Sequence, residues 1–576
     1  MKRFIVALLA LGSLALSGCS ANVQLVPGTV INVAETGSMI SLNPDVVTTT
    51  AAQHFAEEVS HLTSESFFLL DEAGDLVANE GFGSVTVDSE NPLTVTYEIA
   101  QGRKWSDGQP VDSADLALSF AAATNPEGTN FYSRRAKSGL QFASVKDFGL
   151  RSITLEFSQP VSDWRTALPV YVAAHAVAAH ALDGIEAVAG KAAVIEALQS
   201  KNVEKLQKLA ESYRSAFAPG REGFSMEALV TNGAYTVSGV VQDLSVALEA
   251  RTKYQGDYAP VVEKVNLKVY GDSMAALADM NAGKIDIIGA TESGLVKYSD
   301  LIGMVESLSS VKAKTSLRNG ASADMVVFNF GEGSVFNKSN YKSRPGIGAE
   351  LRKAFMAIVP KARIVQNASA STQIKATDSF IYPSSSRYYA GSVSANGSEN
   401  YLLQDVEQAA EIVDASGVDA PVDVRVVYDS ANPRSVAQFK AINERVASAG
   451  FNLIDASSAS PSRVLLAGEF DVFIGPRDLA GVPGAEPSSL TGDNVTRYQD
   501  SRVSALLVQY AKASKELKQA EVLQKIDARL FATGYGIPLF QVPNLIIYRS
   551  NLEKLAVSPF GDSATWGYWT WSVSAK

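Results

Sequence analysis

Several stretches of the chain alternate between apolar and polar residues with a period of two. Residues 93–99, Leu-Thr-Val-Thr-Tyr-Glu-Ile, place every second, apolar side chain on one face, and residues 152–157 follow the same pattern. Successive side chains of a strand point to opposite faces of a sheet, so both stretches are predicted to be half-buried strands. Further predicted strands are residues 29–34, 245–251, 265–269 and 422–427.

Other stretches space their apolar residues as an amphipathic helix does. Leu351, Phe355 and Ile358 fall on one helical face. A second such pattern covers residues 436–446 and is followed by Gly450, a residue that commonly ends helices. Strands alternate with helices in this half of the chain, which predicts an α/β fold.

Composition alone predicts the structure of three more regions. Residues 173–215 are rich in Ala, Glu, Lys, Leu and Gln and are predicted to be helical, with Gly184 and Gly190 as candidate breaks. Residues 384–398 and 480–493 are rich in Ser, Ala and Gly and are predicted to be loops.

Residues 104–108, Lys-Trp-Ser-Asp-Gly, join a predicted strand to a predicted helix. Asp112 is a candidate cap for that helix, and Asp115 stands in its first turn, where the helix dipole favours negative charge. Leu116 and Phe120, four residues apart, then face one core. We therefore interpret the Trp-Ser-Asp segment as a capping and packing device rather than as a binding pair.

The N-terminus has the pattern of an export signal. Residues 1–3, Met-Lys-Arg, precede an apolar stretch at residues 4–16 that is too short for a stable membrane span. The stretch ends in Leu-Ser-Gly-Cys, which resembles the bacterial lipobox, and Cys19 is the single cysteine of the chain. Cys19 is therefore the predicted lipidation site.

This leader predicts a lipid anchor on the outer face of the bacterial cytoplasmic membrane, extracellular or periplasmic. Residues 1–18 are the predicted signal peptide, and residues 19–28 are a short polar tether. No later stretch has the roughly 18 consecutive apolar residues of a membrane span. The mature protein is expected to be anchored to the membrane rather than to cross it.

Composition and charge narrow the class further. The chain has 576 residues, of which 46% are hydrophobic and 19% charged, as in globular proteins. Its formal net charge is −11, and loss of Lys2 and Arg3 with the leader brings the mature chain to −13. Such an acidic protein repels nucleic acid, and no nucleic-acid partner is expected. With a single cysteine, an intramolecular disulfide is excluded.

The residues that usually carry catalysis or bind metals do not form recognisable motifs. His175 and His180 are five apart, which is off the spacing that places two imidazoles on one helix face, and His54 and His61 are seven apart. A zinc or nickel site needs at least three convergent ligands. No nucleophile elbow, phosphate-binding glycine loop or His-Glu-x-x-His motif occurs. We therefore expect no metal, no cofactor and no enzymatic activity, although a hydrolase remains an alternative.

Several segments together resemble extracellular solute-binding protein family 5, the oligopeptide-, dipeptide- and nickel-binding group. The long segment 104–120 resembles the family signature, in which Lys-Trp-Ser-Asp-Gly precedes an acidic helix start that ends in Ser-Phe. Asn232-Gly233-Ala234-Tyr235 resembles the family's Gly-x-Gly-Pro-Tyr turn, with Asn and Ala as departures. Other matching segments, in the family's order, are Ser41-Leu42-Asn43-Pro44, residues 276–288, Phe328-Asn329, residues 351–365 and Gly536-Ile537-Pro538-Leu539.

The resemblance implies an α/β fold with two lobes, similar to the type II periplasmic binding proteins, and an extra subdomain in the first lobe. Lobe one would span residues 29–300, with the subdomain at about 46–215, and lobe two residues 310–535. Residues 536–576 would return to lobe one. The ligand would lie between the lobes and stabilise their closed arrangement.

The resemblance also implies a function and a set of binding residues. The protein would be a monomer that captures short peptides and delivers them to the permease subunits of an ABC importer. Asp478 is the candidate partner of the peptide α-ammonium, and Thr36, Gly37 and Asn232 are candidates for main-chain contacts from lobe one. The alternatives are another solute, such as a nickel chelate or an oligosaccharide, and a sensing or chaperone lipoprotein without a transporter.

Overall fold

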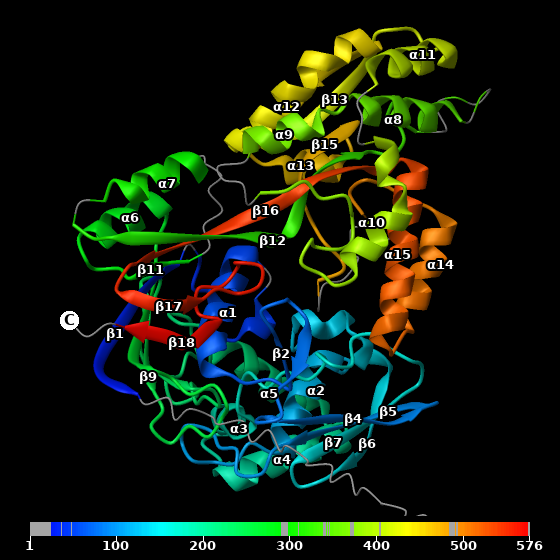
Figure 1. Ribbon diagram of the computed structural model, residues 1–576. Coiled ribbons are helices and arrows are strands. Elements are labelled where there is room, and N and C mark those ends of the chain that lie inside the picture. Colours follow the sequence, from blue (N-terminus) through cyan, green and yellow to red (C-terminus); the bar gives the residue numbers. More distant parts are fainter. Residues whose placement is uncertain are drawn as a thin grey trace, which may run out of the picture.

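Two long strands run side by side through the middle of the molecule. The computed structural model describes residues 25–573 except 36, 48, 290–297, 309, 338–340, 342–343, 345, 369–373, 402–404, 483–489 and 491–493. In it, β12 (Ala313–Phe328) and β16 (Gly536–Arg549) pair antiparallel along most of their length. Figure 1 shows them running from the left-hand and lower part of the molecule, here called the first lobe, to the upper right part, the second lobe.

Both long strands belong to one sheet, which has ten strands in the described part of the chain. Its order is β14-β13-β15-β12-β16-β11-β1-β10-β9-β8. The first-lobe strands are β1 (Val26–Glu35), β8 (Tyr235–Val241), β9 (Ser245–Ala250), β10 (Val262–Val269) and β11 (Ile287–Ile288). The second-lobe strands are β13 (Val422–Tyr428), β14 (Phe451–Asp455) and β15 (Val472–Asp478). β1 is parallel to β10 and β11, and β13 to β14 and β15, so the sheet is mixed.

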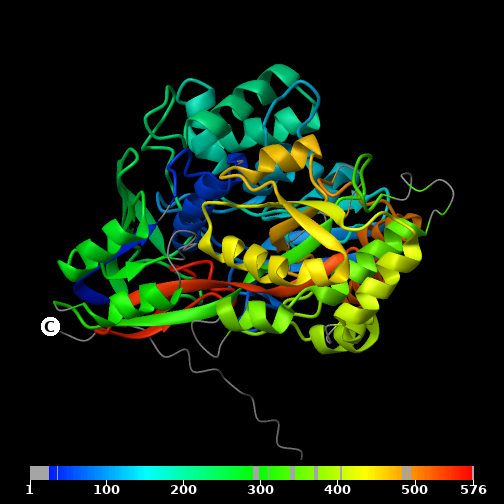
Figure 2. The ribbon, with the colours of Figure 1, turned by 90° about the horizontal axis from the view of Figure 1, so that it is seen from above.

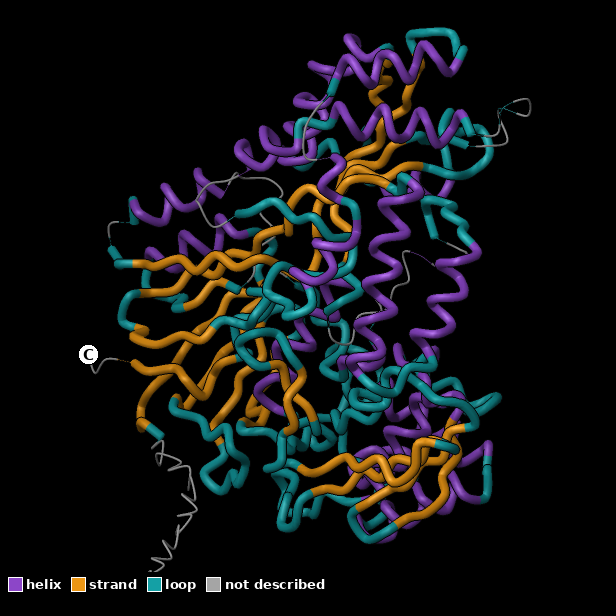
Figure 3. Tube along the Cα trace, turned by 45° about the vertical axis from the view of Figure 1, so that its right-hand side comes forward, coloured by secondary structure: helices purple, strands orange, loops and turns teal. Residues whose placement is uncertain are grey.

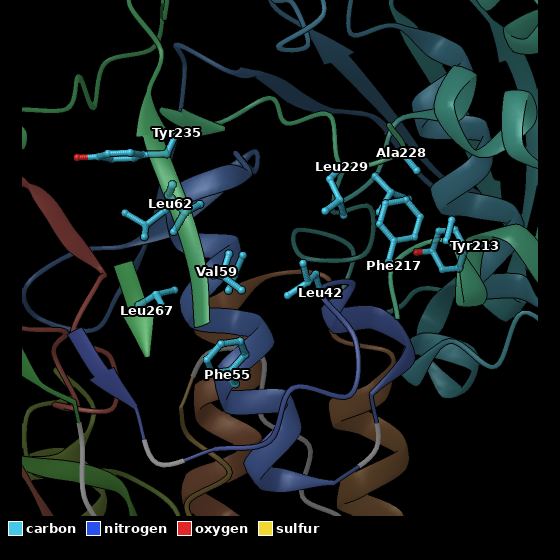
Figure 4. Close-up of a cluster of buried hydrophobic side chains, with 14 of the residues drawn as sticks. Leu42, Phe55, Val59, Leu62, Tyr213, Phe217, Ala228, Leu229, Tyr235 and Leu267 are labelled. Atoms are coloured by element: carbon cyan, nitrogen blue, oxygen red, sulfur yellow. The ribbon is translucent and has the colours of Figure 1, made fainter. Parts of the chain in front are cut away.

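Helices pack around the sheet in both lobes (Figures 1 and 2). The first lobe has α1 (Thr50–Thr63), α6 (Ser273–Asn281) and α7 (Tyr298–Glu306). The second lobe has α8 (Ile347–Ile358), α9 (Lys361–Ala368), α10 (Tyr389–Asn396), α11 (Val406–Ser416), α12 (Pro433–Val446), α13 (Pro461–Ala467), α14 (Ser501–Ala511) and α15 (Glu516–Thr533). Each lobe encloses its own hydrophobic core. In the first lobe Phe55, Val59 and Leu62 of α1 are buried (Figure 4), and in the second Phe355 and Ile442.

The first lobe carries an extra subdomain, seen below the long strands in Figure 1 and from another side in Figure 3. Its sheet has the order β4-β5-β7-β6. Its elements are β4 (Gly83–Glu90), β5 (Leu93–Ile99), β6 (Ala143–Phe148), β7 (Ser152–Phe157), α2 (Ser113–Thr124), α3 (Ala174–Ala181), α4 (Ala187–Gln199) and α5 (Val203–Ser215). Two short strand pairs complete the lobe, β2 (Phe68–Leu70) with β3 (Leu76–Ala78) and β17 (Leu552–Ala556) with β18 (Gly567–Val573).

The strand and cap predictions for the subdomain are confirmed. Residues 93–99 and 152–157 form β5 and β7, which pair antiparallel, and the apolar faces of both are buried. Asp112 caps α2, since its carboxylate accepts from the backbone N–H of Ala114, while Asp115 accepts from the Asp112 N–H. The buried Trp105 indole donates to Asp115 at 3.1 Å. The Trp-Ser-Asp segment thus packs and caps the subdomain, as predicted.

Two predictions of local structure are wrong. Residues 384–398 are not all loop, because α10 forms within them. Its Ser392 and Asn396 side chains donate to the buried carboxylate of Asp527 in α15, a contact that local composition does not reveal. Gly190 does not break the helical region but lies inside α4, whereas Gly184, at a φ of 75°, does separate α3 from α4.

Candidate ligand-binding site

A cavity of about 470 Å³ lies between the two lobes. The first lobe contributes residues from 73–76, 134–138 and 162–171, and the second lobe residues from 382–388 and 510–523. The volume falls within the roughly 300–1,000 Å³ that ligand pockets usually have. The cavity is therefore large enough for a small solute that touches both lobes.

The wall of the cavity combines aromatic rings with charges of both signs. The aromatic residues are Tyr171, Tyr382, Tyr388, Tyr510 and Phe560. The charged residues are Asp75, Arg134, Arg135, Asp163, Arg165 and Glu516. Such a wall suits a solute that has both apolar and charged groups.

Arg135 is committed to a buried ion pair with Asp45. Its Nε and Nη2 each lie 2.9 Å from a carboxylate oxygen of Asp45, and Nη1 donates to the carbonyl of Ala167 at 2.8 Å. Burial alone would raise the pKa of Asp45, but the charge and hydrogen bonds of Arg135 outweigh burial and lower that pKa. Tyr213 also donates to this carboxylate, at 2.8 Å. Arg135 therefore fixes the wall rather than presenting a free charge.

The other two arginines of the wall differ in their partners. Arg134 forms an ion pair with Glu57 at 3.1 Å, and both side chains are partly exposed. The guanidinium of Arg165 lies over the indole ring of Trp164, 4.8 Å from the ring centre. Its charge contributes to lowering the pKa of Glu516 across the cavity.

Among the described residues of the second-lobe wall, Glu516 is the charged one. Its carboxylate accepts hydrogen bonds from Arg387 and from the Tyr388 hydroxyl, the latter at 3.1 Å. Burial would raise the pKa of Glu516, but these hydrogen bonds outweigh burial and lower it. Arg387 also approaches Asp75 of the first lobe at 3.7 Å, so the charges of the two lobes are linked at the cavity.

A buried carboxylate holds the segment that carries Tyr382 and Tyr388. Asp527 accepts from the Ser379 hydroxyl at 2.8 Å and from the Phe380 N–H at 2.9 Å, in addition to its contacts with α10. Burial raises the pKa of Asp527 despite these hydrogen bonds. The aromatic part of the second-lobe wall is thereby fixed to α15.

At one edge of the cavity the lobes touch through a group of polar contacts, here called the clasp. The Trp164 indole donates to the carbonyl of Ser514 at 3.0 Å, and Gln519 Nε2 donates to the carbonyl of Ser162 at 2.8 Å. Lys515 pairs with Glu90 at 2.8 Å. Figures 1 and 3 show α14 and α15 extending from the second lobe to the subdomain at this point.

The predicted binding residues differ in their surroundings. Asp478 is the exposed last residue of β15, paired with Ser322, and it precedes Ala480 of the cavity wall by two residues. The side chain of Asn232 is buried and engaged, since it accepts from the Glu65 N–H at 2.7 Å and donates to the Val170 carbonyl at 3.0 Å. Gly37 follows β1 and is half-buried.

Two further predicted residues, Thr36 and Cys19, lie outside the described residues. The contacts assigned to Asp478, Thr36, Gly37 and Asn232 therefore stay predictions. The sequence interpretation missed Arg165, Glu516 and the tyrosines, because they come from separate segments and share no motif.

Among the described helices, none is both long and apolar enough to span a bilayer.

The histidines have individual partners. His54 Nε2 contacts the buried Glu35 at 3.0 Å, and His175 contacts Asp107 at 2.8 Å. Burial would lower the pKa of His54, but the hydrogen bond and charge of Glu35 raise it to about 10. The described residues include no group of three or more His, Cys, Asp or Glu placed to hold a metal ion.

A two-lobed fold with a cavity between the lobes suits a protein that closes around a small solute, and the comparison with known families identifies the class of protein. The family model for the bacterial extracellular solute-binding proteins, family 5, middle region, matches residues 76–490. The chain belongs to this family, which confirms the predicted resemblance and the fold class. Proteins of this family are the extracytoplasmic solute-binding components of ABC importers and bind solutes without converting them.

The chain is also similar to individual proteins over nearly its whole length. An uncharacterised lipoprotein of Mycobacterium tuberculosis is 21% identical over 564 residues, which cover 93% of this chain and 92% of the relative. The structure of the periplasmic EDTA-binding protein EppA has a TM-score of 0.77 at 18% identity and covers 97% of this chain and 99% of its own. The oligopeptide-binding protein AppA of Bacillus subtilis, in complex with a nonapeptide, has a TM-score of 0.64 at 14% identity, with 95% and 99% covered.

Proposed function

We propose that this protein is the lipid-anchored receptor of an ABC importer and that it captures short peptides between its lobes. The observation that carries the proposal is the interlobe cavity of about 470 Å³, whose wall combines charges of both signs with aromatic rings. A peptide is zwitterionic and bears apolar side chains, so it needs both kinds of contact. The peptide complex of AppA supports the same ligand class.

In this proposal Asp478 pairs with the peptide α-ammonium, and Thr36, Gly37 and Asn232 supply main-chain contacts from the first lobe. Closing of the lobes around the peptide would present it to the permease subunits. Captured peptides would be released without being cleaved, because the proposed role is binding. Incubation with a mixed peptide pool is expected to return every peptide unchanged, and cleavage abolished by a point mutation in the cavity would favour a hydrolase instead.

The ligand itself can be identified directly. Native mass spectrometry of the protein purified from its own cells is expected to detect bound peptides that disappear on unfolding and refolding. Adding back the same peptides should raise the melting temperature, because a ligand that binds only the folded state stabilises it. Recovery of a different solute would contradict the peptide proposal.

A second candidate ligand is an anionic metal chelate. The first-lobe wall carries Arg165, which forms no ion pair with any described residue, and the structurally similar EppA is an EDTA-binding protein. A metal chelate has no free ammonium group, so it would not need the contact proposed for Asp478. Tight binding of metal–EDTA complexes together with no binding of peptides would favour this candidate.

The anchor is proposed to be a lipid on Cys19, as the lipoprotein relative suggests. Cys19→Ala removes the sulfur that would carry the diacylglyceryl group. The variant is expected to lose lipid labelling and to leave the membrane fraction, as measured by radiolabelled palmitate incorporation and fractionation. Unchanged labelling and membrane retention would rule out Cys19 as the anchor.

A further inference from the structure

We infer that Arg165 is the anchor for a carboxylate group of the bound solute. The inference rests on the proposed function, because it takes the interlobe cavity as the solute site. It adds the chemical class of the solute, which must present a free carboxylate to the first-lobe wall.

The hydrogen bonds and ion pairs of the three wall arginines distinguish Arg165 from the other two. Arg135 is saturated by Asp45 and by backbone carbonyls, and Arg134 is paired with Glu57. In the described part of the chain, Arg165 donates no hydrogen bond and forms no ion pair. A half-buried guanidinium that lines a cavity and forms no ion pair with any described residue is suited to an anionic ligand.

The ring beneath Arg165 holds the guanidinium in place before any ligand arrives. Trp164 is only 7% exposed, and its indole N–H is fixed by the carbonyl of Ser514. A guanidinium stacked on an immobile ring retains its planar fork of N–H donors for a carboxylate. Because less side-chain freedom is lost on binding, the hydrogen bonds contribute more to affinity.

The surrounding charges do not cancel this role. Glu516, the acid whose pKa Arg165 helps to lower, already accepts from Arg387 and Tyr388. Asp163, two residues from Arg165, accepts from the backbone N–H of Gly139 at 2.9 Å. A ligand carboxylate would therefore find Arg165 as the least committed cation of the wall.

For a peptide, this arrangement sets the direction of binding. The C-terminal carboxylate would lie against the subdomain, at Arg165, and the rest of the peptide would extend toward the second lobe. Peptides that end in an amide would lose this contact. A carboxylate from a non-peptide acid, such as a chelator, would use the same guanidinium.

The test compares acids with amides on matched variants. A tripeptide library with free C-termini, the same library amidated, and EDTA and citrate are offered to the wild type, Arg165→Gln and Arg165→Lys. Arg214→Gln is the control, because Arg214 also stacks on an aromatic ring, Tyr132 at 4.9 Å, but does not line the cavity. Binding is ranked by native mass spectrometry and measured by calorimetry, and circular dichroism checks folding.

Arg165→Gln is expected to weaken free-acid tripeptides by about tenfold to a hundredfold, the usual range for a lost charge-assisted hydrogen bond. The amides should bind the wild type and Arg165→Gln equally. Arg165→Lys should recover part of the loss because it keeps the charge without the fork. Arg214→Gln should bind like the wild type.

The outcomes separate the inference from the proposed function. If acids and amides bind the wild type equally well, the carboxylate anchor is overturned while the peptide proposal stands. If no tripeptide binds but EDTA or citrate does, and Arg165→Gln weakens it, the anchor stands and the peptide proposal falls. Failure of every probe to bind would overturn both.

Discussion

Asp45 illustrates how a single buried carboxylate maintains the cavity wall. Asp45→Asn would leave the charge of Arg135 buried without its partner, which typically costs about 3–5 kcal/mol. We expect a loss of that size in urea denaturation. Glu57→Gln is the control, because its pair with Arg134 is partly exposed and should contribute less than about 1 kcal/mol. Equal losses in the two variants would contradict this assignment.

The same carboxylate predicts a pH dependence of stability. The pKa of Asp45 is lowered below its ordinary value of 3.8 in the folded protein. A group with a depressed folded pKa contributes its stabilisation above the unfolded pKa and loses it as the pH falls through the folded value. The wild type should therefore lose stability below about pH 4 more steeply than Asp45→Asn does.

Asp478 carries the prediction about the peptide ammonium. In the proposal, closure of the lobes buries the pair between Asp478 and the peptide ammonium. Removing one partner of a buried ion pair costs about 3–5 kcal/mol, so Asp478→Ala should weaken free-amine peptides at least about a hundredfold. N-acetylated peptides should bind the wild type weakly and lose little further in the variant, as measured by calorimetry. Because Asp478 is exposed, the melting temperature without ligand should hardly change.

The control for this prediction is Asp423→Ala. Asp423 is also an exposed carboxylate on a second-lobe strand, but it accepts a hydrogen bond from Asn452, whereas Asp478 stands two residues before Ala480 of the cavity wall. Its loss should leave peptide affinity unchanged. Equal affinity of Asp478→Ala and the wild type for free-amine peptides would place the ammonium partner elsewhere.

At the scale of elements, α10 depends on a carboxylate in another helix. Asp527→Asn keeps the size of the side chain but replaces one accepting oxygen with a donor. Depending on which oxygen is replaced, either the bond from the Phe380 N–H or the bonds from Ser379, Ser392 and Asn396 are lost. Amide hydrogen exchange in residues 377–396 should become faster in this variant. No change in this segment would show that packing alone holds it.

A matched variant tests whether the effect is local. Asp500 also accepts backbone N–H bonds, from Arg502 and Val503, and it pairs with Arg529 of α15. Asp500→Asn should speed exchange at the start of α14 and leave residues 377–396 unchanged. The two variants together would assign each segment to its own carboxylate.

Sequence predicts best those elements that are determined by residues close to one another in the chain. β5 begins at Leu93 and ends at Ile99, as its alternation predicts, because its apolar face is buried in a core while Thr96 and Glu98 on the other face are more exposed. The cap of α2 is likewise a contact between Asp112 and residues two and three positions away. α10 was missed because its stabilising partner, Asp527, is distant in sequence. Local pattern thus identifies elements but not the long-range polar contacts that complete them.

The candidate site depends almost wholly on such long-range contacts. Arg165 and Glu516 stand in segments with no shared motif, and only the packing of the subdomain against α15 brings them to one cavity. Arg135 and Arg165 are both arginines, and sequence alone does not distinguish them. The ion pair with Asp45 leaves Arg135 unable to offer a free charge to a ligand. The family resemblance predicted that a cleft exists between the lobes, whereas the charges that line it required the structure.

At the scale of the whole molecule, the clasp couples the two lobes independently of any ligand. Trp164→Phe with Gln519→Ala removes two hydrogen bonds between the lobes and keeps the ring beneath Arg165. At about 0.5–1.5 kcal/mol for each bond, the lobe equilibrium should shift toward an open arrangement by roughly fivefold to a hundredfold. Small-angle scattering of the ligand-free protein should then give a larger radius of gyration.

The matched control changes a similar bond inside one lobe. Gln207 Nε2 donates to the carbonyl of Gly128 at 2.8 Å, and both residues belong to the subdomain, so Gln207→Ala should leave the scattering unchanged. The clasp variant should also bind solute more weakly, because affinity falls with the fraction of molecules in the binding-competent arrangement. If scattering and affinity both match the control, the clasp contacts do not set the lobe equilibrium. A change in affinity without a change in scattering would instead mean that Gln519, which lines the cavity, acts by touching the solute.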